Sequence, residues 1–183
     1  MKLAKSLDRL GTETAFSVLA EAKKLEAAGK PMIHLGLGQP DFKTPKHIVD
    51  AAKKALDDGH HGYVLSNGIL ECRQAVTRKI KKLYNQDIDP ERIIIMPGGK
   101  PTMSYAIQCF GEPGVEIIHP TPAFPIYESM INFTGAKPVP YDLTEDKDLK
   151  FNPEKILSLI TEKTRLLVLI NPNNPTGSFV DKS

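Results

Sequence analysis

The chain has 183 residues, of which 40% are hydrophobic and 25% are charged, which is the composition of an ordinary globular protein. Its 24 basic and 22 acidic residues give a formal net charge of +2, so neither nucleic acid nor an anionic membrane surface is an expected partner. The first residues lack the apolar core of a signal peptide, and no stretch approaches the ~18 apolar residues that a membrane span requires. We therefore expect a soluble, cytoplasmic protein.

Three helices are predicted in the first half of the chain, within residues 12–30, 45–59 and 69–83. The Gly- and Pro-rich stretch from residue 31 to 45 is too irregular for a long element. The third helix should bury one apolar stripe made of Cys72, Val76, Ile80 and Leu83. Because the two cysteines, Cys72 and Cys109, show no metal-ligand spacing, we expect them to be buried, reduced thiols.

In the second half, short apolar runs alternate with helical patterns. The runs that predict strands cover residues 92–96, 115–120, 136–141 and 165–170. One of the helices between them has an apolar face of Met103, Ala106, Ile107 and Phe110. Continuous apolar strands separated by helices predict an α/β fold with a mostly parallel sheet and helices on both faces. The prolines of the run 136–141 make it a poor candidate for the centre of the sheet.

Open α/β sheets bind ligands beyond the carboxyl ends of their strands, and the turn Pro97-Gly98-Gly99-Lys100 falls at such a place. Two glycines allow a ligand to approach the backbone closely, and the helix N-terminus that follows offers free N–H groups to an anion such as phosphate. The spacing is neither that of a Walker A motif nor that of a GxGxxG fingerprint. A tight turn without a ligand is the alternative interpretation.

A second candidate stretch, Asn171-Pro172-Asn173-Asn174-Pro175-Thr176-Gly177, follows the last predicted strand. Its two prolines fix the backbone and restrict the residues before them, so the loop can orient a side-chain amide with little loss of entropy. Asn174 is then a candidate donor to a ligand oxygen at the edge of the sheet. An ordinary Asn-Pro turn is the alternative, although two Asn-Pro pairs within four residues favour a ligand-binding role.

Residues 171–177, NPNNPTG, resemble the Asn-Pro-x-Asn-Pro-Thr-Gly signature of class I and II aminotransferases. These are fold-type I pyridoxal phosphate-dependent enzymes and include aspartate aminotransferase. Four further segments resemble stretches of the same family in the same order, namely GLGQPDFKTP, YVLSNGILECRQAV, MPGGKPTMSYAI and HPTPAFPIYESM. The resemblance implies that residues 1–45 are an N-terminal helix and arm of the small domain and that residues 46–183 begin the cofactor-binding large domain.

The resemblance also implies how pyridoxal 5'-phosphate is held. The turn Gly98-Gly99-Lys100 would bind the phosphate, and Asn174 would bind the phenolic oxygen. Phe124 would stack on the pyridine ring, although Ala123-Phe124 replaces the Tyr-Trp pair that is frequent in the family.

The remaining implied roles concern the substrate and a second subunit. Gly38 would lie beside the carboxylate of the substrate, and Asn174 would also border the substrate. Tyr63 matches the tyrosine that reaches the phosphate of the partner subunit, so a homodimer is implied. The substrates implied for the family are an amino acid and a 2-oxo acid.

By the same resemblance, the lysine that carries the cofactor as a Schiff base would lie beyond residue 183. The aspartate that pairs with the pyridine nitrogen and the arginine that holds the substrate carboxylate would lie there too. Lys100 cannot replace that lysine because it belongs to the phosphate turn. We therefore expect no catalytic residue within these 183 residues and no transamination by them alone. Two alternatives to an aminotransferase are a non-catalytic metabolite-binding module and a lyase on the same fold.

Overall fold

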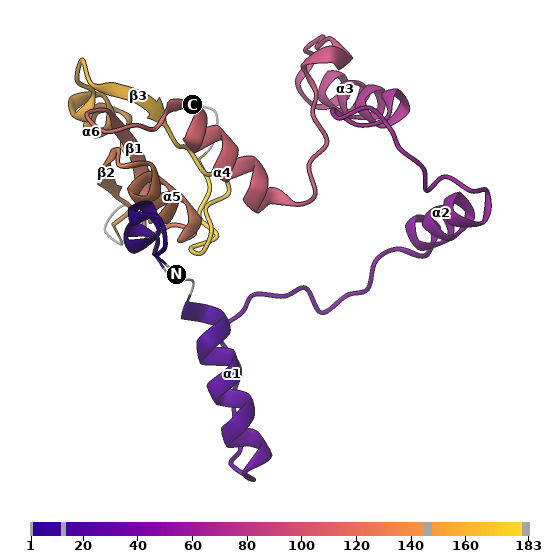
Figure 1. Cartoon of the computed structure of the whole chain (residues 1–183), viewed down its shortest axis with the longest axis horizontal. Helices are drawn as coiled ribbons and strands as arrows, with labels where there is room; N and C mark the ends of the chain where they lie inside the picture. The colour runs from indigo at the N-terminus through magenta and orange to yellow at the C-terminus, as the bar shows by residue number, and fades with distance from the viewer. Residues whose placement is uncertain (1, 12–13, 145–147, 181–183) are drawn as a thin grey trace. The chain divides into compact units, whose positions relative to one another are not determined.

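The computed structural model describes residues 2–11, 14–144 and 148–180, without the side chains of residues 14 and 15 (Figure 1). The chain forms two compact units, one made of residues 1–30 with 98–183 and the other of residues 31–97. None of the helices in the described ranges is long and apolar enough to cross a membrane. The domain boundary expected after residue 45 stays a prediction.

The first unit is built on a parallel sheet of three strands in the order β2-β1-β3. β1 spans Glu116–Thr121, β2 spans Lys137–Asp142 and β3 spans Thr164–Leu167. The first five residues of β1 are buried, which is typical of a central strand covered on both faces. β2 lies at the edge, as its prolines predict.

Helices cover both faces of this sheet. On one face, Ile107 of α4 (Gly99–Phe110) and Ile131 of α5 (Ile126–Thr134) share a hydrophobic cluster with Ile117. On the other face, Ile156 of α6 (Pro153–Leu159) shares a cluster with Ile118. Ile117 and Ile118 are both 0% exposed, and the burial of each contributes roughly 1.5–3 kcal/mol. The predicted α/β fold with helices on both faces of a parallel sheet is confirmed.

The first unit also contains the N-terminal elements η1 (Lys5–Arg9) and α1 (Thr14–Ala27). The second unit contains α2 (Lys46–Asp57), α3 (Leu70–Tyr84) and the short helix η2 (Pro90–Arg92). All of the predicted helices are therefore present. The structure adds the two short 3₁₀ helices, which are too brief to produce a periodic pattern in the sequence.

The second unit is organised around Arg73, whose side chain is only 2% exposed. Its Nε donates to the carbonyl oxygen of Gly68 at 3.1 Å, and its Nη1 donates to the carbonyl oxygen of Pro90 at 3.0 Å and to Glu91 Oε1 at 2.7 Å. Gly68 has a φ of +94°, and a Cβ there would lie 2.7 Å from Cγ1 of Ile95, so both backbone and space require glycine. These contacts connect α3 with the loop before it and with the segment after it.

The strand predicted over residues 92–96 is wrong. Arg92 ends η2, and residues 93–96 pair with no strand in the described part of the chain. The backbone N–H of Ile95 donates to the carbonyl oxygen of Asn67, and the side chain of Ile94 is 64% exposed. A strand needs a neighbour for its hydrogen bonds, and an apolar run alone does not supply one.

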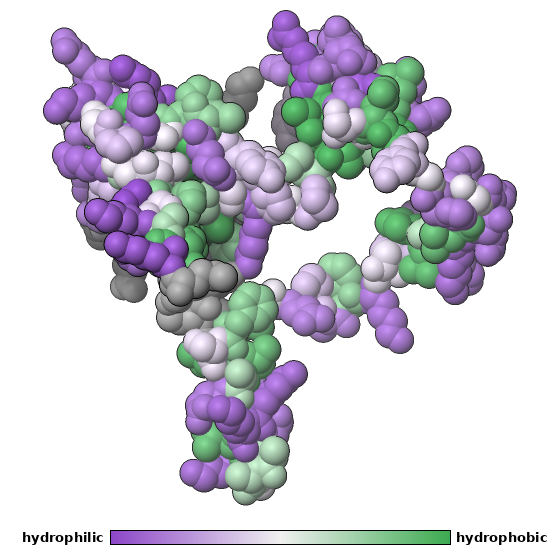
Figure 2. All heavy atoms as spheres, in the orientation of Figure 1, coloured by the Kyte–Doolittle hydropathy of each residue, from purple (hydrophilic) through white to green (hydrophobic). Residues whose placement is uncertain are grey.

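The burial expected along two helices is also wrong. In α3, Cys72 and Leu83 are exposed, and in α4 only Ile107 of the predicted apolar face is buried. Cys109 is exposed as well, so neither cysteine is a buried thiol. Figure 2 shows hydrophobic residues on the surface of α2 and α3. The exposed hydrophobic side chains of these helices include Ile48, Leu56 and Leu83. Periodicity identifies which face of a helix is apolar, but it does not identify what covers that face.

Candidate cofactor site

The turn before α4 has the geometry of an anion seat. Gly98 has a φ of +102° and a ψ of 168°, which is a conformation that residues with a side chain rarely adopt. α4 begins at the next residue, so its first N–H groups have no partners within the helix. The side chain of Thr102 donates to the carbonyl oxygen of Gly98 at 3.3 Å and ties the turn to the helix. Gly98 and Gly99 therefore expose backbone amides at the positive end of a helix dipole.

The ammonium group of Lys100, in this turn, lies near two aromatic rings. Its Nζ lies 5.6 Å from the centroid of Phe124, which is half-buried in the loop after β1, and 5.3 Å from the centroid of Phe16 in α1. Both distances are within the range of a cation–π contact. The structure thus places Lys100 and Phe124 side by side, as a shared site requires. Phe16 was not a predicted site residue, because an aromatic on an apolar helix face is usually a packing residue.

Asn174 lies at a solvent-exposed position of the loop that follows β3. Asn174 is exposed, and no side-chain hydrogen bond of its amide is found among the described residues. The peptide bonds before Pro172 and Pro175 are cis, as is the bond before Pro122 in the loop after β1. An exposed amide on a loop rich in proline remains available to a ligand oxygen.

The neighbouring Asn173 is 6% exposed and connects this loop to the loop of Phe124. Its Nδ2 donates to the carbonyl oxygen of Pro122 at 3.2 Å and to Thr176 Oγ1 at 2.9 Å. Pro122 is two residues before Phe124, and Asn173 immediately precedes Asn174. Sequence reasoning missed Asn173, because it occupies the variable position of the signature and only its burial reveals a role.

The first unit contains five of the predicted site residues, Gly98, Gly99, Lys100, Phe124 and Asn174. Phe124 follows β1 and Asn174 follows β3, and the contact of Lys100 with Phe124 brings the turn before α4 to the loop after β1. Gly38 and Tyr63 belong to the second unit, where both are exposed and Tyr63 is completely so. The roles assigned to these two residues stay predictions.

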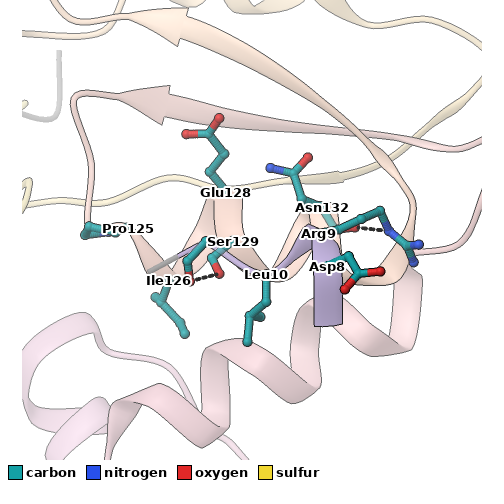
Figure 3. A pocket seen from close by; sticks show the side chains of 9 residues that line it. Asp8, Arg9, Leu10, Pro125, Ile126, Glu128, Ser129 and Asn132 are labelled. Atoms are coloured by element: carbon teal, nitrogen blue, oxygen red, sulfur yellow. Dashed lines mark hydrogen bonds between the residues drawn. The ribbon is translucent and has the colours of Figure 1, made fainter. Parts of the chain in front are cut away.

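A cavity of about 370 Å³ lies elsewhere in the first unit, between η1 and α5 (Figure 3). Arg9 Nε donates to the carbonyl oxygen of Asn132 at 2.8 Å, and Ser129 Oγ donates to that of Gly11 at 3.1 Å. Two carboxylates, Asp8 and Glu128, also line it. Because the guanidinium is engaged and the acids repel anions, this cavity does not suit a phosphate.

Two buried polar residues lie on β1. Burial lowers the pKa of His119, whose Nδ1 donates to the carbonyl oxygen of Pro120 at 3.1 Å. Glu116 accepts hydrogen bonds from Lys137 at 2.9 Å and from Thr161 at 2.7 Å, and these bonds hold the pKa of Glu116 below its ordinary value. Glu116 is at the amino end of β1, opposite to the end that bears the candidate site, so we interpret it as a structural residue.

Pyridoxal 5'-phosphate fits the chemistry of these residues. Its phosphate suits the open backbone amides of Gly98 and Gly99, and its flat ring suits Phe124. Its phenolic oxygen suits the free amide of Asn174. Fold and site together are those of an α/β protein whose candidate site has the chemistry to suit a phosphate-bearing aromatic cofactor.

Comparison with known proteins identifies the family. Residues 30–183 match the family described as aminotransferase class I and II, and the chain belongs to this family. Aspartate aminotransferase of Bacillus subtilis (strain 168) is 38% identical over 177 residues, which are 97% of this chain and 45% of that protein. The (5-formylfuran-3-yl)methyl phosphate transaminase of Methanocaldococcus jannaschii is 37% identical over 180 residues, which are 98% of this chain and 46% of that protein.

The same likeness holds in three dimensions. The structure of aspartate aminotransferase from Thermus thermophilus with maleate matches with a TM-score of 0.93 and 31% identity, covering 100% of this chain and 48% of that one. The resemblance inferred from the sequence is confirmed. The chain spans about half the length of the relatives that it matches.

Proposed function

We propose that this chain forms the cofactor-binding part of a pyridoxal phosphate-dependent aminotransferase. The enzyme would transfer an amino group between an amino acid and a 2-oxo acid. Membership of the aminotransferase family supports the reaction, and the first unit supports the cofactor. A cytoplasmic location agrees with the composition of the chain.

Two contacts that link three separate chain segments support this proposal. Lys100 Nζ contacts the ring of Phe124, and Asn173 bonds the loop of Asn174 to the loop of Phe124. These segments supply, in turn, backbone amides for an anion, a ring for stacking and an amide for a phenolic oxygen. When bound, the cofactor would withdraw electrons from the α-carbon of the substrate.

The chain's own residues would bind and orient. The amides of Gly98 and Gly99 would hold the phosphate, and the ammonium of Lys100 would add positive charge beside it. Phe124 would restrict the ring to one plane, and the amide of Asn174 would donate to the phenolic oxygen and stabilise its ionised form. Gly38 would leave room for the substrate carboxylate.

We further propose a homodimer in which Tyr63 reaches the phosphate bound by the partner subunit. Tyr63 is fully exposed in the described structure, which leaves its phenol available. Light scattering should give the mass of two chains. Removal of the phenolic hydroxyl in Tyr63→Phe should weaken the binding of a phosphate-bearing ligand without changing that mass.

The test of the cofactor seat uses 4-deoxypyridoxine 5'-phosphate, which keeps the ring, phenol and phosphate but lacks the aldehyde that reacts with lysines. Calorimetric titration should show one saturable site per chain. Asn174→Ala should weaken binding about tenfold, as the loss of one good hydrogen bond to a charged oxygen predicts. Asn85→Ala, at the end of α3, is the control and should leave binding unchanged. Absence of saturable binding by the unaltered protein would reject the proposal.

A second test concerns the lysines of this chain. Incubation with pyridoxal 5'-phosphate followed by borohydride reduction should label no single lysine specifically, since Lys100 is engaged at the phosphate turn. Labelling of one lysine in stoichiometric amount would contradict this assignment. In an activity assay, formation of the 2-oxo acid from the donor amino acid, matched by amination of the acceptor, distinguishes amino-group transfer from a lyase reaction. Absence of both would favour a metabolite-binding module.

A further inference from the structure

Asn173 is an unusual residue for a buried position. Its side chain is 6% exposed, and its Oδ1 has no hydrogen-bond partner among the described residues. A buried acceptor without a partner costs about 1–3 kcal/mol, so a residue used only to fill space would be apolar. A polar residue kept at such a cost commonly belongs to a functional site.

The side-chain hydrogen bonds of Asn173 are made by its amide nitrogen. Nδ2 donates two hydrogen bonds, one to the carbonyl oxygen of Pro122, 51 residues earlier in the chain, and one to Thr176 Oγ1. The reversed amide would bring its oxygen against the carbonyl oxygen of Pro122, which repels it. The bond to Pro122 therefore fixes the orientation of the amide.

The hydrogen bonds continue in one direction from Asn173. Ser178 Oγ donates its hydrogen to the carbonyl oxygen of Leu149 at 2.8 Å, so in the 2.7 Å contact between the two hydroxyls Thr176 is the donor. Thr176 Oγ1 in turn accepts from Asn173. The result is a chain of donors from Asn173 through Thr176 and Ser178 to Leu149, and each hydroxyl supplies its single hydrogen once.

The backbone adds to the same cluster. The N–H of Asn173 donates to the carbonyl oxygen of Ser178, and the N–H of Gly177 donates to the carbonyl oxygen of Asn173, both at 2.8 Å. The loop that carries Asn174 is thus closed on itself, and the bond to Pro122 anchors it to the loop that carries Phe124.

From these contacts we infer that Asn173 is a positioning residue that sets Asn174 relative to Phe124. This inference rests on the proposed function, because it assigns Asn173 to the seat of the same cofactor. Asn173 does not contact the cofactor. It attaches the loop of Asn174, whose amide would bind the phenolic oxygen, to the loop of Phe124, whose ring would stack on the pyridine.

The test compares three variants of the 183-residue chain, with 4-deoxypyridoxine 5'-phosphate as the probe. Asn173→Ala removes both bonds of the amide, and Thr176→Val interrupts the donor chain while keeping the shape of the side chain. Asn171→Ala is the matched control, because Asn171 also makes two hydrogen bonds, to the backbone of Val180, but does not reach the loop of Phe124.

Two readouts are measured below the melting temperature of every variant. The dissociation constant should rise roughly tenfold in Asn173→Ala and by a smaller factor in Thr176→Val, but less than twofold in Asn171→Ala. The absorbance of the bound probe against pH reports ionisation of its phenol. The pKa of that phenol should rise in Asn173→Ala, because the amide of Asn174 is no longer held at the oxygen, and should stay constant in Asn171→Ala.

The outcomes are distinguishable. If the unaltered chain binds the probe and Asn173→Ala gives the same affinity and phenol titration, Asn173 is only a structural residue and the inference is wrong. The same conclusion follows if Asn173→Ala lowers only the melting temperature. If Asn173→Ala does not fold, unchanged affinity and phenol titration in Thr176→Val would overturn it. If the unaltered chain does not bind the probe, the proposed function and this inference both fail.

Discussion

The ammonium group of Lys100 lies 5.6 Å from the centroid of the Phe124 ring, although the two residues belong to different segments of the fold. Lys100 stands in the first turn of α4, and Phe124 stands in the loop after β1. The contact joins the expected phosphate end of the cofactor site to its expected ring-stacking side. Each residue can be tested separately.

Replacing Lys100 by methionine should weaken binding of 4-deoxypyridoxine 5'-phosphate about threefold to tenfold, because a positive charge beside the phosphate and its contact with Phe124 are lost. The salt dependence of the dissociation constant should also become shallower. Calorimetry at two ionic strengths measures both effects. Lys79→Met, on the exposed side of α3, is the control. An unchanged salt dependence in Lys100→Met would place the phosphate elsewhere.

Replacing Phe124 by leucine should weaken binding of the same probe roughly threefold to tenfold, since stacking adds about 0.5–1.5 kcal/mol beyond apolar contact. Phe124→Trp keeps a flat ring and should bind at least as well as the unaltered chain. Phe110→Leu, at an exposed position of α4, controls for the general loss of a phenyl ring. Equal loss in the leucine and tryptophan variants would argue against stacking.

Sequence patterns predicted the elements of the first unit well, because their strands are paired within the chain. The run 115–120 became the central strand, and the prolines of the run 136–141 indicated an edge strand. The run 92–96 was just as apolar, but it has no neighbouring strand in the described residues. Local propensity identifies what a segment can form, whereas the presence of a partner decides what it does form.

Individual residues, like the secondary-structure elements, were predicted only where a local sequence pattern marks them. Gly98 and Asn174 were predicted because turn chemistry and an anion-binding helix end are visible in the sequence. Asn173 and Arg73 were missed because each acts by donating hydrogen bonds to carbonyl oxygens of residues that are distant along the chain. No local sequence pattern reveals such contacts. The spacing of Cys72 suggested burial, but the buried residue of that helix is the adjacent Arg73.

Arg73→Met should lower the free energy of unfolding of the second unit by about 2–4 kcal/mol, because the carbonyl oxygens of Gly68 and Pro90 lose their donor. Glu91→Gln should cost less than about 1 kcal/mol, since the Glu91 side chain is 67% exposed and its ion pair is screened by water. Urea denaturation measures both values, with Arg78→Met as the exposed control. Equal losses in the Arg73 and Glu91 variants would show that the ion pair, not the carbonyl contacts, stabilises the unit.

His119 should make stability depend on pH. Burial lowers the pKa of His119 in the folded chain, against smaller opposing effects of the Pro120 carbonyl and Glu128. The unfolded chain binds the proton first, so the contribution of His119 is complete above the unfolded pKa of about 6.5 and declines as the pH falls below it.

The variant that tests this is His119→Phe, in which the free energy of unfolding should change less between about pH 7.5 and pH 5. Denaturant titrations across that range measure the effect. His47→Gln, at an exposed position of α2, should retain the pH dependence of the unaltered chain. A pH dependence that survives in His119→Phe would assign it to other groups.

We propose that one cofactor site is formed by Gly98, Gly99, Lys100, Phe124 and Asn174. An amide chemical-shift map of the isotopically labelled chain, titrated with 4-deoxypyridoxine 5'-phosphate, can test whether these residues respond to one ligand. The backbone amides of these five residues should shift together along one saturation curve. Shifts confined to the cavity between η1 and α5, or separate curves for the Gly98 turn and the Asn174 loop, would contradict it.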